Sequence, residues 1–274
     1  MNLTTRLPKH LQYFLLALLG GILLWAGWPP SILFPLLFVG FVPLLFIEER
    51  ISRGTSVNYR WQLFLYSFLF FVTWNALTTW WIKNATLPGA IFAIIANALL
   101  MCIPFLLFHI TKQRLGSAIG YFSLFVYWIT FEYIHLQWEL TWPWLTLGNG
   151  LAAFPQLIQW YEYTGVFGGT LWILGLNVLL FRGLNHYFFL HNELGRPSGY
   201  RKVKAIISAG KWIFLLLIPI GISLIIFSRY EEKGDPVEVV VLQPNIDPYH
   251  VKFRLPVDEQ LAMFLQQSAT GITS

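Results

Sequence analysis

The sequence predicts a mainly α, polytopic membrane protein: a bundle of seven transmembrane helices followed by the first β-strand and helix of an incomplete α/β domain. Of the 274 residues, 56% are hydrophobic and only 11% are charged, whereas a soluble domain carries roughly 25% charged residues. Apolar stretches long enough to cross a bilayer recur along the chain, and a segment of different composition follows them. The single cysteine, Cys102, excludes an intrachain disulfide framework.

A helix needs about 20 predominantly apolar residues to cross the hydrocarbon core. Seven segments fit this requirement: Leu11–Trp28, Ile32–Ile47, Trp61–Ile82, Ala90–Ile110, Ile119–Leu136, Val166–Phe181 and Ile207–Phe227. Pro29 and Pro30 follow the first segment. Because proline lacks a backbone N–H and disfavours helix in the residue before it, we expect a tight hairpin there between the first two spans.

The distribution of positive charge predicts the orientation in the membrane. Loops on the cytoplasmic side carry an excess of Lys and Arg. Most of the 18 Lys and Arg residues fall on the side of the N-terminus, whereas Lys83, Arg229, Lys233, Lys252 and Arg254 fall on the other. This predicts a cytoplasmic N-terminus and, after seven crossings, an extracytoplasmic segment 231–274. Since the cations lie in short loops beside apolar segments, the net charge of +5 does not indicate nucleic-acid binding.

A tryptophan-rich loop at residues 137–163 separates the fifth and sixth predicted spans, and it contains no Lys or Arg. Its aromatic residues include Trp138, Trp142, Trp144 and Trp160. Aromatic rings with polar edges favour the lipid–water boundary. We therefore interpret the loop as an extracytoplasmic lid or lipid-facing platform.

The region from residue 231 differs from the membrane domain, residues 1–230. Val237–Leu242 is a β-branched run typical of one buried strand, and Gln243 and Asn245 lie in the break that follows it. Pro256–Gln267 has proline at a suitable first helical position and predicts a helix. A lone strand and helix do not make a stable core, so we expect residues 231–274 to be the truncated start of a larger domain.

Several motifs together resemble bacterial apolipoprotein N-acyltransferases. They are Gly27-Trp28-Pro29-Pro30 with Phe41-Val42-Pro43-Leu44-Leu45, Trp128-x-x-x-Glu132-Tyr133 with Trp142-Pro143-Trp144-Leu145 and Gly148, Gly165 before a helix with Asn177, and Val239–Ile246. The last looks like the first strand of a nitrilase-like domain. The resemblance covers essentially the whole chain.

The resemblance implies transfer of an acyl chain from a phospholipid to the N-terminal diacylglyceryl-cysteine of an apolipoprotein, through a cysteine thioester. A Glu–Lys–Cys triad in the extracytoplasmic nitrilase-like domain carries this reaction in the family. All three residues would lie beyond Ser274, so we assign no catalytic residue and expect this chain alone to be inactive. The implied partners are the phospholipid donor, the apolipoprotein acceptor and membrane lipid, in the bacterial inner membrane, with no cofactor.

The candidate residues for lipid or substrate binding are Trp142, Pro143, Trp144, Leu145, Glu132 and Glu162. For each the structural alternative stays open: belt anchoring for Trp144, a solvated carboxylate for Glu162, and pairing with His135 and loop backbone for Glu132. Structural roles are expected for Pro29, Pro30, Gly165, Asn177, Gln243 and Asn245. The histidines show no metal-ligand spacing, so no metal is assigned.

Two other functions remain open. One is a non-enzymatic polytopic protein, such as a transporter or lipid-binding scaffold, although transporters usually show paired broken helices or internal repeats and none is visible here. The other is a related membrane-anchored nitrilase-like enzyme with a different acyl acceptor, which this sequence does not distinguish from the first.

Overall fold

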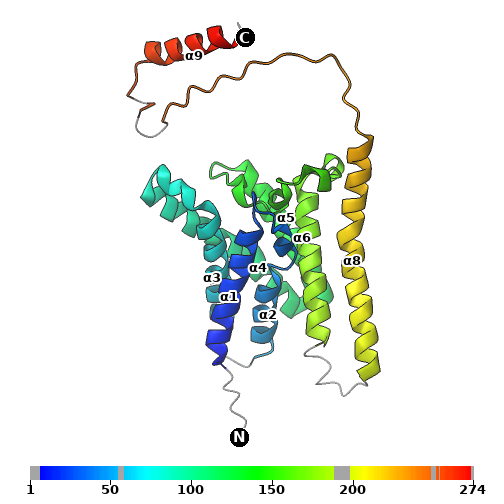
Figure 1. Cartoon of the computed structure of the whole chain (residues 1–274). Helices are drawn as coiled ribbons and strands as arrows, with labels where there is room; N and C mark the ends of the chain where they lie inside the picture. Colours follow the sequence, from blue (N-terminus) through cyan, green and yellow to red (C-terminus); the bar gives the residue numbers. More distant parts are fainter. Residues whose placement is uncertain (1–6, 55–58, 188–197, 248–250, 253, 273–274) are drawn as a thin grey trace.

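The computed structural model describes residues 7–54, 59–187, 198–247, 251–252 and 254–272. These residues are mainly helical, and the long helices lie side by side in a bundle (Figure 1). Five helical segments are long and apolar enough to cross a membrane: Lys9–Gly27, Tyr59–Asn84, Leu87–Leu115, Tyr161–Asn185 and Ile206–Arg229. The prediction of a helical, multi-pass membrane protein is therefore confirmed, but the count of seven spans is not.

The elements follow in the order α1 (Lys9–Gly27), η1 (Phe34–Phe38), α2 (Val42–Ser52), α3 (Tyr59–Thr79), η2 (Trp80–Asn84), α4 (Leu87–Leu115), α5 (Ser117–Gln137), η3 (Pro143–Leu145), η4 (Leu147–Leu151), η5 (Pro155–Leu157), α6 (Tyr161–Asn185), α8 (Ser198–Arg229) and α9 (Val257–Ile272). The η elements are short 3₁₀ turns. Three of them form the tryptophan-rich loop between α5 and α6.

The centre of the bundle is packed with aromatic rings. Phe41, which directly precedes α2, lies with its ring centroid 5.2 to 6.4 Å from those of Phe70, Phe71, Trp74 and Trp128. All five side chains are almost completely buried. The turn before α2 therefore contributes the ring that joins α3 to α5.

The second predicted span, Ile32–Ile47, is not one continuous helix. It consists of η1 and the start of α2, and α2 has 11 residues. At about 1.5 Å per residue, α2 is much shorter than the ~30 Å hydrocarbon core. Pro35 and Pro43 explain the interruption, because each removes a backbone donor near the start of a helical segment.

The amide of Asn177 in α6 occupies this interruption. Its Oδ1 accepts a hydrogen bond from the backbone N–H of Phe41 at 2.8 Å, and its Nδ2 donates to the backbone carbonyl of Leu37 at 2.8 Å. Leu37 and Phe41 are four residues apart, so a continuous helix would join these two groups directly. The Asn177 side chain thus replaces the helical hydrogen bond between these two backbone groups. It satisfies both of them in a place away from water.

The segment after α8 contains the predicted helix but not the predicted strand. The helix expected at Pro256–Gln267 is present as α9. The prediction of a strand at Val237–Leu242 is not confirmed, because no strand occurs among the described residues and this run is irregular chain. A strand needs a neighbouring strand for its backbone groups. No such neighbour is present in the described part, and Val237 and Val241 are more than four-fifths exposed.

The two ends of the bundle differ in what they carry. The tryptophan-rich loop and the end of α8 that leads into the C-terminal segment lie at one end, and the N-terminus of the chain lies at the other (Figure 1). The loop and the C-terminal segment are therefore on the same side of the bundle.

Candidate functional site

Glu132 attaches the tryptophan-rich loop to the bundle. Its side chain is buried, and Oε1 accepts hydrogen bonds from the indole N–H of Trp128 at 3.0 Å and the backbone N–H of Leu147 at 2.8 Å. Oε2 accepts a hydrogen bond from the hydroxyl of Thr170 at 2.7 Å. One carboxylate thus joins α5, the loop and α6, and three donors compensate for its burial.

Two close approaches hold the same stretch of the loop against α6. The Gly148 N–H donates to the Thr170 hydroxyl at 3.1 Å, and the Tyr161 hydroxyl donates to the Gly148 carbonyl at 2.9 Å. A Cβ atom on Gly148 would lie 2.0 Å from the Val166 carbonyl oxygen. Only glycine fits at this position without displacing the backbone.

His135 does not pair with Glu132, in contrast to the alternative considered from their spacing. Its Nε2 lies 3.0 Å from Oδ1 of Asn97, and its Nδ1 accepts from the indole N–H of Trp138 at 2.9 Å. Asn97 in turn donates to Asn75 at 2.6 Å. His135 therefore continues a polar chain across α3, α4 and α5, while Glu132 faces α6.

An apolar groove of about 890 Å³ lies at the end of the bundle that carries the tryptophan-rich loop. Its walls come from the end of α1 and the turn after it, from the end of α3 with η2, and from the loop. The lining includes these aromatic and proline residues: Trp25, Trp28, Pro29, Pro30, Trp80, Trp81 and Trp144. We call this space the aromatic groove.

Among the six candidates for lipid or substrate binding, Trp144 is the one that lines the groove. It is about half exposed, and its ring makes an edge-to-face contact with Trp81 at 5.2 Å between centroids. Leu145 is buried in the core, and Pro143 begins the 3₁₀ turn η3. Trp142 is partly buried and does not line the groove. Loop residues that are adjacent in sequence thus have different surroundings.

The remaining candidates lie in three places: α6, the turn after α1, and the chain beyond α8. Glu162 is exposed in the first turn of α6. At Gly165 the helix is interrupted by a kink, and the φ of 63° there is a conformation that favours glycine. Pro29 and Pro30 line the groove. Gln243 and Asn245 lie in the irregular chain beyond α8, where Asn245 has φ of 55°.

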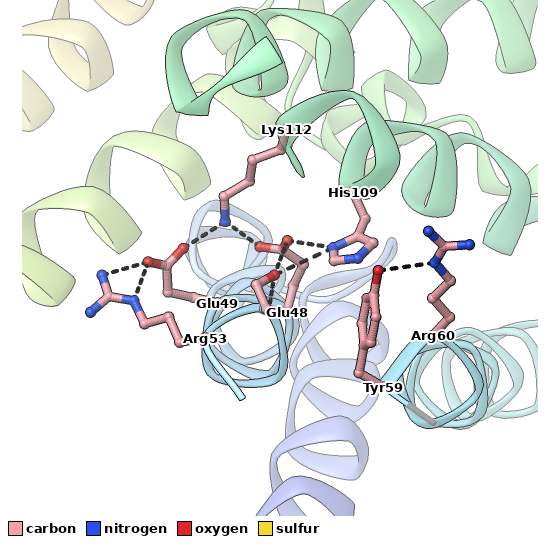
Figure 2. Close-up of polar contacts among 8 residues, drawn as sticks. Glu48, Glu49, Arg53, Tyr59, Arg60, His109 and Lys112 are labelled. Carbon is pink, nitrogen blue, oxygen red and sulfur yellow. Dashed lines mark hydrogen bonds and ion pairs between the residues drawn. The ribbon is translucent and has the colours of Figure 1, made fainter. Parts of the chain in front are cut away.

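A second polar cluster, at the opposite end of α4, was not predicted. Figure 2 shows Lys112 of α4 reaching between Glu48 and Glu49 of α2, with its Nζ 2.5 Å from a carboxylate oxygen of each. Nδ1 of His109 lies 2.8 Å from Glu48, and Arg53 pairs with Glu49 at 2.7 Å. In the sequence, the adjacent acidic residues Glu48 and Glu49 at the end of an apolar segment were the signal that could have indicated this cluster.

The charges in this cluster balance. Burial raises the pKa of the Glu49 carboxyl, but the hydrogen bonds and positive charges of Lys112 and Arg53 outweigh burial and hold the pKa below its ordinary value. Glu48 is completely buried beside the same lysine. Two carboxylates and two cations therefore form a neutral network that connects α2 to α4.

A bundle of long apolar helices, with an aromatic groove that an anchored loop borders at Trp144, defines the class: a multi-pass helical membrane protein. Residues 20–179 match the family model described as the apolipoprotein N-acyltransferase N-terminal domain, and they are more than half of the chain. The chain belongs to this family. Glu132, the tryptophan-rich loop and most of α6 lie within the matched range.

Curated relatives agree with this assignment. The apolipoprotein N-acyltransferase of Chlorobaculum tepidum is 28% identical over 255 residues, which are 91% of this chain and 44% of the relative. That of Geobacter metallireducens is 27% identical, over 85% of this chain and 43% of the relative. Apolipoprotein N-acyltransferase 2 of Treponema denticola is 24% identical, over 86% of this chain and 45% of the relative. The chain thus spans less than half the length of these relatives. No solved structure matches it.

Proposed function

We propose that this chain is the membrane part of an apolipoprotein N-acyltransferase, which transfers an acyl chain from a phospholipid to the N-terminal diacylglyceryl-cysteine of lipoproteins. The observation that carries the proposal is the aromatic groove that Trp144 lines. Its volume of about 890 Å³ is within the range of ~300–1,000 Å³ for ligand pockets. In this proposal the groove receives the acyl donor.

The chemistry of the groove suits a phospholipid. Its lining is mostly apolar, and Trp25, Trp80 and Trp144 remain substantially exposed, so an acyl chain has rings to pack against. The Nζ of Lys83 lies 4.8 Å from the ring centroid of Trp80. A cation next to the groove supports binding of a lipid phosphate in the same region.

Orientation is part of the proposal. The excess of Lys and Arg on the N-terminal side supports a cytoplasmic N-terminus in a bacterial inner membrane. With this orientation, the tryptophan-rich loop, the groove and residues 231–274 face the periplasm. We assign residues 1–230 to the membrane domain and 231–274 to the start of a nitrilase-like domain. In such a domain, neighbouring strands would cover the valines of the first strand that are exposed here.

Photo-crosslinking tests the groove. The chain is placed in nanodiscs that contain a phosphatidylethanolamine with a diazirine on one acyl chain, and the crosslinked peptides are mapped by mass spectrometry. Crosslinks are expected in the ends of α1 and α3 and in the loop. Trp144→Ala removes one aromatic contact worth about 1 kcal/mol, so the yield is expected to fall about five-fold.

Trp61→Ala is the matched control, because Trp61 is also an exposed tryptophan of this bundle and does not line the groove. Its crosslinking yield is expected to match the wild type. An equal loss in both variants, or crosslinks spread evenly over all helices, would refute the groove as the donor site.

The proposal assigns no member of the Glu–Lys–Cys triad to the residues of this chain. Membranes that contain only this chain are therefore expected to leave a diacylglyceryl lipopeptide without an N-acyl group. Mass spectrometry of the lipopeptide measures this, and N-acylation above the background of empty membranes would contradict the assignment.

A further inference from the structure

A second pocket lies at the end of the bundle that carries the N-terminus, away from the aromatic groove. It has a volume of about 560 Å³ and is bordered by the ends of α2 and α6, the start of α5 and a segment of α8. We call it the basic pocket. Leu179, Phe181 and Ile207 give it an apolar side, and Arg182 and Lys211 bring positive charge to it.

The positive charge of this pocket is not balanced within the described part of the chain. Glu49 lines the pocket, but Lys112 and Arg53 both pair with Glu49, and Lys112 also pairs with Glu48. Arg182 and Lys211 have no carboxylate partner among the described residues. The Arg182 guanidinium instead lies over the ring of Tyr121, at 5.6 Å from the centroid. Two formal positive charges at the pocket are therefore left without a counter-charge from the residues that the structure describes.

An unpaired amide is available to a ligand in the same place. Asn185 lines the pocket and is only 8% exposed as a residue, and its side chain has no hydrogen-bond partner within the described part of the chain. Its amide atoms are not sealed inside the protein, so they are open to the pocket. Ser117 also lines the pocket as the first residue of α5, and no side chain caps that helix end. Its free N–H groups add a positive partial charge.

The α8 wall of the pocket is firmly attached. The Trp172 indole of α6 donates to the Leu215 carbonyl of α8 at 2.8 Å, and the Trp212 indole of α8 donates to the Leu176 carbonyl of α6 at 3.1 Å. These reciprocal bonds fix the register of the two helices. Lys211, next to Trp212, is thereby held at the pocket.

We propose that the basic pocket binds the phosphate group of a glycerophospholipid, with Arg182 and Lys211 as the cations, Asn185 as a hydrogen-bond donor and the apolar side against the acyl chains. A phosphodiester carries one negative charge and accepts several hydrogen bonds, which matches this set of groups. The site does not depend on the proposed acyl transfer, because it lies at the other end of the bundle from the aromatic groove.

Lipid retention tests the proposal. The full chain is purified in detergent, depleted of lipid and titrated with phosphatidylglycerol, and bound lipid is counted by native mass spectrometry. Each positive charge near a phosphate contributes about 1 kcal/mol, or about five-fold in affinity. The double variant Arg182→Gln, Lys211→Gln is therefore expected to bind about 25-fold more weakly than the wild type.

Arg114→Gln is the matched control, because Arg114 is an exposed arginine in the last turn of α4 that does not line the pocket. It is expected to bind like the wild type. Asn185→Ala keeps every charge and is expected to lose several-fold in affinity. It serves as the test if the double variant does not fold, as judged by circular dichroism.

A second arm separates the two sources of phosphate. Inorganic phosphate and glycerol 3-phosphate are titrated calorimetrically into the same lipid-depleted protein. The proposal is supported if the double variant loses lipid binding and neither soluble phosphate competes with the lipid. Tight binding of a soluble phosphate with no retained lipid would overturn the lipid assignment. Equal binding of lipid by the wild type and all variants would overturn the site.

Discussion

Replacing Asn177 by Leu removes the amide from the interrupted helix before α2 with little change in volume. The Phe41 N–H and the Leu37 carbonyl would then lose the partners that each now contacts at 2.8 Å. Leaving one buried polar group unpaired costs about 1–3 kcal/mol, so two such groups predict a loss of about 2–6 kcal/mol in the free energy of unfolding. An ordinary hydrogen bond between membrane helices is worth about 0.6 kcal/mol on average.

Unfolding by sodium dodecyl sulfate in mixed micelles, followed by circular dichroism, measures this difference. Asn84→Leu is the control, because it changes the same residue type at an exposed position in η2 where no described hydrogen bond is lost. Its effect is expected to be below about 0.5 kcal/mol. A loss below about 1 kcal/mol for Asn177→Leu would refute the reasoning, since it would mean that Leu37 and Phe41 pair with each other once the amide is gone.

Two further predictions concern the loop anchor and the buried cluster. Glu132→Gln replaces one acceptor oxygen by an amide that faces a donor, so it is expected to cost about 1–3 kcal/mol and to make the tryptophan-rich loop faster to cleave by limited proteolysis. Unchanged cleavage would contradict the anchoring role. Lys112→Met leaves two carboxylates without the cation between them and is expected to cost about 3–5 kcal/mol in the same unfolding assay, with Arg114→Met near zero as control. Because the native pKa of Glu49 is lowered, the stabilisation from its ion pairs is present above pH 4.5 and is lost as the pH falls below it; a stability that is flat across this range would count against the pair.

Composition and apolar length were sufficient to predict a helical membrane protein, because burial in lipid requires long apolar helices. The same rule failed at Ile32–Ile47. Hydropathy does not show that Pro35 and Pro43 interrupt the helix. It also does not show that Asn177, far along the chain, makes the hydrogen bonds that the unpaired backbone groups need. The predicted strand at Val237–Leu242 is irregular chain, because the described residues include no neighbouring strand to pair with it.

The candidate site was predicted in part. Tryptophan enrichment and the absence of cations located the loop, and the structure brings Trp144 to a groove. The partners of Glu132 were not predictable from spacing alone. His135 lies three residues away on the same helix, but a helix face is wide enough for the two side chains to contact different neighbours, here Thr170 of α6 and Asn97 of α4.

The attachment of α8 has a mechanical consequence. This helix leads into the C-terminal segment, and it packs on α6 and on the 3₁₀ turn η5 of the tryptophan-rich loop. A pull or tilt applied to the C-terminal segment would be transmitted through α8 to both of these elements. Because η5 belongs to the same loop as Trp144, a displacement of α8 would also strain the loop that borders the aromatic groove.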